Sequence, residues 1–199
     1  MKKILFLALL CISLLKLDAQ NPAIKSAAPI KPAMGGNIRM SSYYDINDKK
    51  GYYIVWDMKT GKSIQYYWDS NSSSWKAFEL NITSSPVPGA TGNIMFDVYY
   101  DFKDSKAYYI AWDTKSGKSI QYYWNSNDGK WSAFEINLPA NPLPGATGEI
   151  MMKSYFDSTD NKAYYLVYDT NTGKSLQYYW DSNATKWSAF EINLPAKPM

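Results

Sequence analysis

Three tandem copies of one unit make up most of this chain, and this repeat constrains the fold more than any other feature. The segments 33–88, 89–144 and 145–199 align without a gap. The phrase GKSIQYYW begins at Gly61 and again at Gly117, and GKSLQYYW begins at Gly173. A fixed period of 56 residues is typical of proteins that stack one supersecondary unit on copies of itself. We therefore expect three structurally equivalent units.

The N-terminal segment is expected to lie outside that array. Lys2 and Lys3 precede an apolar run from Ile4 to Leu15, and Ala19 offers a small residue for cleavage. This pattern is typical of a secretory signal peptide, and the run is too short for a membrane span. We expect a signal peptide over 1–19 and a flexible leader over 20–34, followed by repeats over 35–88, 89–144 and 145–199. The expected localisation is secreted, periplasmic or at the cell surface.

Each repeat is predicted to hold four antiparallel strands. In the second repeat these are expected at 93–102, 106–113, 118–125 and 130–138, because those runs are rich in Tyr, Ile, Phe and Trp and are separated by polar turns. Asp113 is expected to cap a hairpin turn that Gly117 closes with a positive φ. The chain after the signal peptide shows no helical periodicity, so the predicted fold class is all-β.

Four-residue turns would make both faces of each sheet apolar. They pair Asp113 with Lys118 and Asn125 with Lys130. One face then collects Tyr108, Ile110, Trp112, Tyr123, Phe134 and Ile136, and the other collects Tyr109, Ile120, Tyr122, Trp124 and Trp131. A sheet that is apolar on both sides needs neighbours on both sides. Sheets stacked like the blades of a β-propeller meet that need.

The predicted architecture is therefore propeller-blade-like, and two other arrangements stay open. A pseudo-threefold β-trefoil or β-prism would also suit three four-stranded repeats, and three small sheets could instead lie on proline-rich spacers. Three blades are too few to close a propeller, so a homodimer could supply six. The turn phrase VWDMKTGKS, which starts at Val55, resembles the WD-type strand–turn–strand of propeller blades.

Composition argues against several classes of function. The chain has no histidine, and its one cysteine, Cys11, lies in the expected signal peptide. Ser-His-Asp and Cys-His catalysis and the usual zinc sites are therefore excluded, and no phosphate-binding glycine phrase occurs. Residues 20–199 carry 18 basic and 17 acidic side chains, a net charge of +1, which gives no support for binding nucleic acid. We expect a non-enzymatic protein without cofactor, metal site, nucleic-acid partner or membrane span.

Aromatic residues suggest a ligand site, because the chain holds 18 Tyr, 8 Trp and 7 Phe. A glutamine, a tyrosine, a tryptophan and a glutamate recur at fixed positions in every repeat. An aromatic wall with a few polar groups is the usual form of a ligand site, and repetition adds avidity. The candidate ligand-binding residues are Gln65, Tyr67, Trp75, Glu79, Gln121, Tyr123, Trp131, Glu135, Gln177, Tyr179, Trp187 and Glu191. Each tryptophan could instead be a core residue that holds the last hairpin.

The phrases QYYWNSNDGKWSAFEI (121–136) and QYYWDSNATKWSAFEI (177–192) resemble repeats of propeller-type lectins, the tectonin and fucose-lectin groups. In those proteins the sugar lies between adjacent blades against a Trp or Tyr. Only Trp131, Glu135 and their equivalents carry over. The resemblance implies a secreted, multivalent, carbohydrate-binding protein whose partners are glycans or glycoconjugates. The alternative is a surface adhesion or structural repeat protein that binds a protein partner.

Overall fold

The computed structural model describes residues 36–79, 82, 85–125, 130–135, 138–139, 141–181 and 186–191. In this part of the chain every regular element is a β-strand, and there is no helix long and apolar enough to cross a membrane. The expected signal peptide and leader lie outside the described residues.

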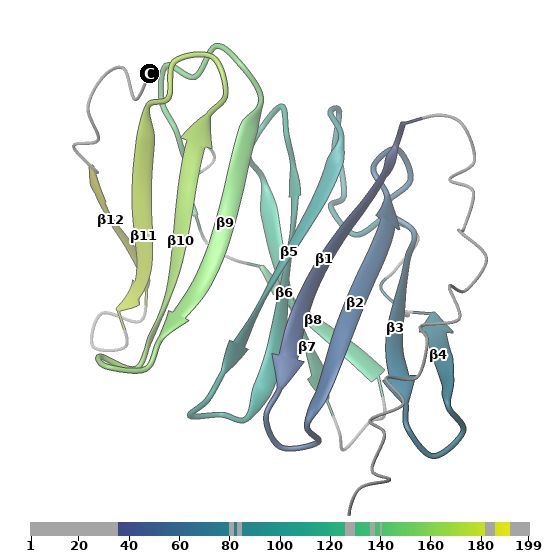
Figure 1. Ribbon diagram of the computed structural model, residues 1–199. Coiled ribbons are helices and arrows are strands. Elements are labelled where there is room, and N and C mark those ends of the chain that lie inside the picture. Colours follow the sequence, from purple (N-terminus) through teal and green to yellow (C-terminus); the bar gives the residue numbers. More distant parts are fainter. Residues whose placement is uncertain are drawn as a thin grey trace, which may run out of the picture. The chain divides into compact units, whose positions relative to one another are not determined.

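The strands form three antiparallel sheets of four, and each sheet takes its strands in chain order (Figure 1). Sheet 1 holds β1 (Ile38–Asp45), β2 (Lys50–Asp57), β3 (Ser63–Asp69) and β4 (Ser74–Glu79). Sheet 2 holds β5 (Ile94–Asp101), β6 (Lys106–Asp113), β7 (Ser119–Asn125) and β8 (Lys130–Glu135). Sheet 3 holds β9 (Ile150–Asp157), β10 (Lys162–Asp169), β11 (Ser175–Asp181) and β12 (Lys186–Glu191). The predicted all-β fold of three four-stranded repeats is confirmed.

Strand register matches the one that the turn lengths predicted. In sheet 2 the backbone N–H of Asp113 donates to the carbonyl of Lys118 at 3.0 Å, and Asn125 lies opposite Lys130. Side chains alternate between faces along a strand, so this register separates two aromatic faces. Each sheet has one face that carries a tyrosine of its second strand and the two tryptophans of its last hairpin, and we call this the leading face. Its residues are Tyr53, Trp68 and Trp75 in sheet 1, Tyr109, Trp124 and Trp131 in sheet 2, and Tyr165, Trp180 and Trp187 in sheet 3. The opposite, trailing faces carry Tyr43, Tyr52 and Gln65, then Tyr99, Tyr108 and Gln121, then Tyr155, Tyr164 and Gln177.

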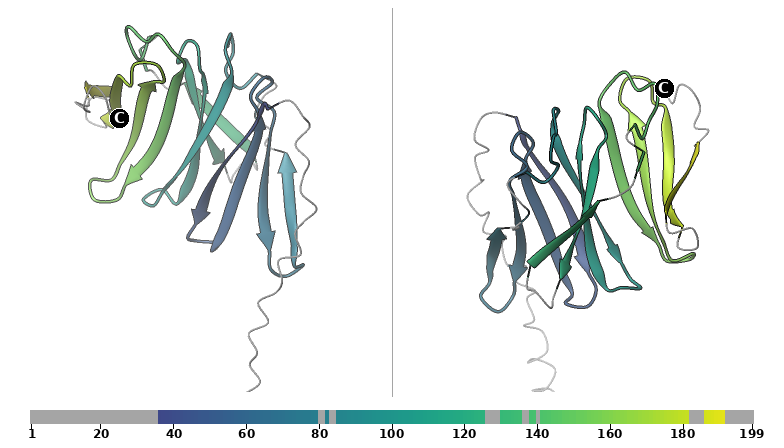
Figure 2. Two further views of the ribbon diagram at one scale, coloured as in Figure 1. Left: turned by 45° about the horizontal axis from the view of Figure 1, so that its top comes forward. Right: turned by 180° about the vertical axis from the view of Figure 1, so that it is seen from behind.

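The trailing face of each sheet packs on the leading face of the next. Tyr43 meets the edge of Tyr109 with ring centroids 5.9 Å apart, and Tyr99 meets Tyr165 in the same way at 6.0 Å. The two hydrophobic cores fill these interfaces. Figure 2 shows the sheets side by side in chain order. Separate sheets stacked in this way form a propeller-like arrangement, rather than a trefoil, a prism or a closed barrel.

Connecting segments also tie neighbouring sheets together. The hydroxyl of Tyr122 donates to the carbonyl of Pro86, and that of Tyr178 donates to the carbonyl of Pro142, both at 2.6 Å. The indole N–H of Trp112 donates to the carbonyl of Ile150, the first residue of the next sheet, at 3.0 Å. Buried backbone acceptors of the connectors are thus paired with side chains of the sheets, as buried polar groups require.

In sheets 2 and 3 the turn aspartate links the hairpin to the connector that precedes the sheet. The Asp113 carboxylate accepts the backbone N–H of Lys115, which confirms the predicted cap, and it also accepts those of Thr91 and Gly92. Burial raises the pKa of Asp113, but these backbone hydrogen bonds outweigh it and hold the pKa below its usual value. Gly117 has the expected positive φ, +71°.

Candidate functional site

Two clefts lie between neighbouring sheets. Cleft 1, between sheets 1 and 2, has a volume of about 650 Å³, and cleft 2, between sheets 2 and 3, has a volume of about 440 Å³. Both values fall within the range of about 300–1,000 Å³ that is usual for small-molecule sites. The clefts are candidate sites because they repeat the same lining.

Each cleft combines polar groups of a trailing face with two tryptophans of the next leading face. Cleft 1 is lined by Tyr52, Gln65, Trp124 and Trp131 among others. Cleft 2 is lined by the equivalent residues Tyr108, Gln121, Trp180 and Trp187. Both sites are therefore built by two consecutive repeats, and neither belongs to one repeat alone.

The predicted ligand set of a single repeat does not form one site. In sheet 2, Trp131 and Glu135 lie opposite Trp124 and Ile120, whereas Gln121 lies opposite Phe134. Gln121 and Trp131 therefore point to opposite faces, because side chains alternate along a strand. The predicted set was wrong as one site because it combined residues that recur together in sequence, although the predicted strand register already places them on opposite faces of the sheet.

The structure instead joins residues of different repeats. Gln65 and Tyr67 of the first repeat line cleft 1 with Trp131 of the second. Gln121 of the second repeat lines cleft 2 with Trp187 of the third. The remaining predicted residues with described side chains line neither cleft, and these are Trp75, Tyr123, Gln177 and Tyr179. The side chains of Glu79, Glu135 and Glu191 lie outside the described part of the structure.

The glutamines lie beneath the clefts and position tyrosines. Gln65 is 2% exposed; its Nε2 donates to the Tyr43 hydroxyl at 3.1 Å, and its Oε1 accepts the Tyr109 hydroxyl at 3.1 Å. Gln121 Nε2 donates to the Tyr99 hydroxyl at 2.8 Å. Because Tyr109 comes from the following sheet, the Gln65 amide bridges two repeats.

The two tryptophans of a cleft differ in exposure. Trp131 is 8% exposed and meets the ring of Tyr109 edge-on at 4.5 Å. Trp124 packs against Trp131 at 5.6 Å and is 39% exposed. The Trp131 indole N–H has no hydrogen-bond partner among the described residues. Cleft 1 therefore presents an accessible indole ring over a buried one, whereas in cleft 2 Trp180 is 38% exposed and Trp187 is half-buried.

Aspartates that the sequence analysis did not select lie at the rim. Asp48 and Asp104 line cleft 1, and Asp104 also lines cleft 2. Asp104 Oδ2 accepts the Tyr108 hydroxyl at 3.0 Å, and Asp48 accepts that of Tyr52. The recurring D-x-x-x-Y spacing was a sequence signal for these pairs.

The rim tyrosines act as hydrogen-bond donors at neutral pH. Burial, and then the hydrogen bond to Asp104, raise the pKa of Tyr108 well above its usual value. In sheet 3, which has no following sheet in the described chain, the hydrogen bond to Asp160 is the main cause and raises the pKa of Tyr164 to about 12. These phenols therefore stay protonated at neutral pH and donate their hydroxyl hydrogen to the rim aspartates.

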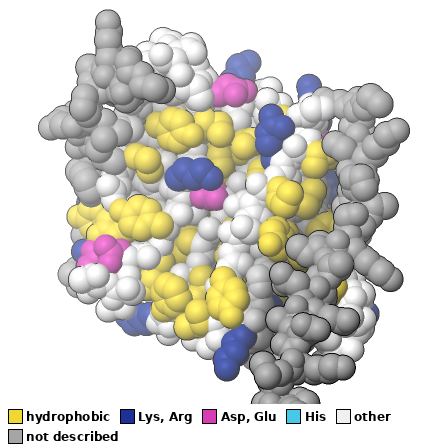
Figure 3. Space-filling view, viewed as in Figure 1, with side chains coloured by type: hydrophobic (Ala, Val, Ile, Leu, Met, Phe, Trp, Pro, Cys, Tyr) yellow, Lys and Arg dark blue, Asp and Glu magenta, His cyan; other side chains and the backbone are white. Residues whose placement is uncertain are grey.

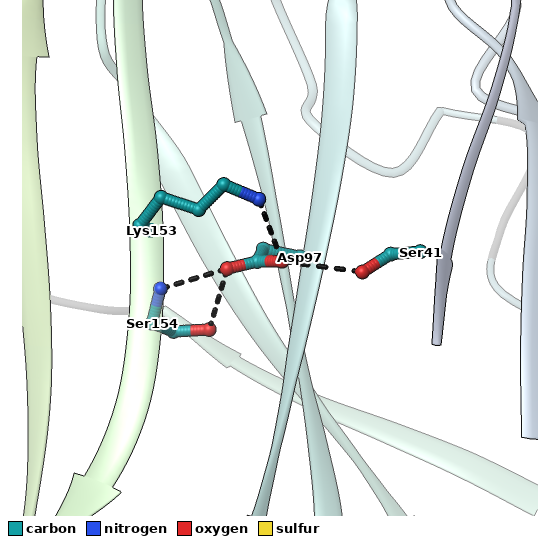
Figure 4. A network of polar contacts seen from close by, with 4 residues as sticks. All are labelled: Ser41, Asp97, Lys153 and Ser154. Atoms are coloured by element: carbon teal, nitrogen blue, oxygen red, sulfur yellow. Dashed lines mark hydrogen bonds and ion pairs between the residues drawn. The ribbon is translucent and has the colours of Figure 1, made fainter. Parts of the chain in front are cut away.

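A second polar cluster joins the first strands of the three sheets (Figure 4). The buried Asp97 carboxylate accepts the Ser41 hydroxyl at 3.3 Å and the backbone N–H of Ser154 at 2.8 Å, and Lys153 Nζ lies 3.4 Å away. Positions 41, 97 and 153 are equivalent, yet they hold Ser, Asp and Lys. Our search for shared residues missed this cluster, and the difference between repeats was its signal.

The described residues hold no group of three or more His, Cys, Asp or Glu side chains that could bind a metal ion.

In the view of Figure 3, apolar side chains form separate groups with lysine or arginine and acidic side chains between them.

Comparison with known proteins finds likeness in structure alone. No protein-family model and no curated protein matches the chain. A luciferin-regenerating enzyme matches over 84% of this chain and 50% of its own, with 13% identity and a TM-score of 0.48. An intramolecular trans-sialidase from Ruminococcus gnavus matches over 77% of this chain and 34% of its own, with 15% identity and a TM-score of 0.42. The chain spans about half the length of the first protein and a third of the second.

These neighbours correct our functional expectation. Both neighbours are enzymes by name, so this chain shares its fold with enzymes, which contradicts the prediction of a non-enzymatic, lectin-like protein or an adhesion protein. At these TM-scores the likeness carries no argument about a substrate or reaction of this chain. The prediction went too far because the lack of histidine and cysteine excludes some catalytic classes only, while carboxylates such as Asp104 remain available for chemistry.

Proposed function

We propose that clefts 1 and 2 bind a carbohydrate. The observation that carries this proposal is the repetition of one set of groups at two inter-sheet positions: two indole rings, a tyrosine held by an aspartate, and a glutamine beneath them. A sugar offers apolar C–H faces and many hydroxyls. An apolar wall with a few fixed polar groups suits such a ligand.

Within each cleft the groups divide between stacking and hydrogen bonding. Trp124 in cleft 1 and Trp180 in cleft 2 are exposed enough to stack against a sugar ring. The carboxylates of Asp48 and Asp104 can accept hydroxyl protons. Lys50 Nζ lies 4.9 Å from the centre of the Tyr67 ring and adds a cation to the rim of cleft 1.

Export through the N-terminal segment is part of the proposal, because glycans and glycoconjugates are abundant outside the cell. Cleft 2 holds Asp101 and Asp104, and carboxylate pairs are the groups with which most glycosidases work.

Glycan-array screening followed by calorimetry tests the proposal. We expect Trp124→Ala and Trp180→Ala each to lower the number of sites per chain by one, because each removes the stacking ring of one cleft. Phe102→Ala is the control, since Phe102 is an exposed aromatic residue (47%) that lines neither cleft. Product analysis after incubation with the best glycan reports any hydrolysis. An array without binding, or a site number that both tryptophan variants leave unchanged, would contradict carbohydrate binding.

A further inference from the structure

The leading face of sheet 1 is open, although the same face is covered in sheets 2 and 3. Tyr53 is 39% exposed, whereas its equivalents Tyr109 and Tyr165 are fully buried. Met40 is 64% exposed, whereas its equivalent Phe96 is 2% exposed. Sheet 1 therefore presents to solvent an aromatic surface that the chain buries in both of its other copies.

The trailing face of sheet 3 is also open to solvent, and it is the kind of face on which a leading face packs elsewhere in the chain. Tyr155 is 45% exposed, and its equivalent Tyr99 in sheet 2 is 6% exposed. The geometry is nevertheless that of a covered face. Gln177 Nε2 donates to the Tyr155 hydroxyl at 2.7 Å, and Tyr155 stacks on Tyr164 at 5.2 Å. The corresponding hydrogen bond in sheet 2 measures 2.8 Å and the corresponding stack 5.4 Å. The face is preorganised for a leading face to pack on it.

We propose that these two faces bind each other head to tail in a second copy of this chain. Sheet 3 of one copy receives sheet 1 of the other, as sheet 1 receives sheet 2 within the chain. The ring of Tyr53 then meets Tyr155 edge-on, as Tyr109 meets Tyr43. Its hydroxyl donates to Oε1 of Gln177, as the Tyr109 hydroxyl donates to Gln65.

Charge is compatible with this contact. Lys153 occupies in sheet 3 the position of Asp97, whose carboxylate accepts Ser154 of the next sheet. The Asp97 carboxylate accepts both the backbone N–H and the hydroxyl of Ser154. The equivalent of Ser154 in sheet 1 is Ser42, so at the junction Lys153 can donate to the Ser42 hydroxyl, while the Ser42 backbone N–H is left to water. No two like charges meet at this position, and the lysine can stay hydrated at the first strands, where its side chain is 63% exposed.

Two copies complete the assembly. A contact between two different faces either closes into a ring or continues as a filament. Propellers typically have about 4–8 blades, and two chains supply six whereas three would supply nine. A closed pair also makes a new cleft at each junction, with Tyr164 and Gln177 from one copy and Trp68 and Trp75 from the other. Trp75 and Gln177, which line neither cleft within one chain, thereby take the places of Trp131 and Gln65.

Sedimentation equilibrium over a wide range of concentrations tests this inference. We expect the wild-type chain to reach twice the mass of one chain. Tyr53→Lys and Tyr155→Lys should each weaken the pair more than about tenfold, because each puts an unpaired ammonium against an apolar ring. Ile46→Lys is the control, since Ile46 is similarly exposed (48%) but lies in the turn after β1, outside the strands that form the open faces. Circular dichroism shows whether each variant is folded.

Mixing the two variants separates a head-to-tail pair from a symmetric one. Tyr53→Lys chains keep an intact sheet 3 and Tyr155→Lys chains keep an intact sheet 1, so their mixture should form a pair joined by one junction. If two leading faces formed a symmetric contact, Tyr155→Lys would not weaken association. If two trailing faces did so, Tyr53→Lys would not weaken association. Either result overturns the proposal, as does a wild-type monomer at every concentration or growth beyond two chains. Carbohydrate binding at clefts 1 and 2 is measured separately and is unaffected by that outcome.

Discussion

Gln65 shows how a single residue can set the packing of two repeats on each other. In the sequence it is a polar residue beside two tyrosines, which suggested contact with a ligand. In the structure it is buried, and its amide joins Tyr43 of its own sheet to Tyr109 of the next. The buried amide is satisfied at both ends, so its first role is to align aromatic rings beneath cleft 1.

We expect Gln65→Leu to lower the free energy of unfolding by about 1–3 kcal/mol, the usual cost of leaving buried polar groups without partners. Tyr109→Phe removes the opposite partner of one of these bonds. The double variant should therefore cost less than the sum of the two single variants. Urea denaturation of the four proteins measures the coupling. Strictly additive losses would show that the Gln65–Tyr109 hydrogen bond does not stabilise the interface.

At the scale of elements, the hairpin turn is where sheets are joined as well as where strands reverse. Gly117 ends the turn between β6 and β7 with φ of +71°, and a Cβ there would lie 2.5 Å from the ring of Pro142 in the connector to sheet 3. Gly173 has nearly the same φ, +68°, but a Cβ there would meet no described atom within 4 Å. The two glycines share a turn and differ in what packs on it.

Gly117→Ala and Gly173→Ala therefore separate backbone strain from packing. Both variants are destabilised by the backbone strain of a left-handed alanine, about 1–2 kcal/mol. Gly117→Ala must also displace Pro142, and overpacking of this kind costs about 1–3 kcal/mol more. Thermal and urea unfolding compare the two directly. Equal losses in both variants would mean that the Pro142 contact is not maintained in solution.

At the scale of the whole molecule, each sheet is stabilised by its neighbours, and among the described residues the two end sheets have one neighbouring sheet each. Both faces of sheet 2 are covered, and Tyr109, Ile110 and Trp112 are almost completely buried. Sheets 1 and 3 each leave one aromatic face exposed. Self-association through those faces would stabilise the folded chain by mass action.

The melting temperature should then rise with protein concentration. Anything that binds only the folded chain stabilises it in proportion to RT ln(1 + [L]/Kd), and here the ligand is a second copy. Scanning calorimetry of the wild type should show this rise, while Tyr53→Lys should melt at one temperature throughout. Concentration-independent melting of both proteins would argue against a folded pair.

Local sequence is enough to predict the strands, their register and the apolar character of both faces. These properties depend on local chemistry: turn length sets the pairing of Asp113 with Lys118, and alternation along the strand then places every side chain. Which repeat's tryptophan meets which repeat's glutamine, in contrast, depends on the packing of one sheet on another. Both faces of a repeat are aromatic, so either could pack on the next sheet. The face that packs is set by how whole sheets fit together. For this reason the candidate sites lie in the clefts between repeats and not within a single repeat.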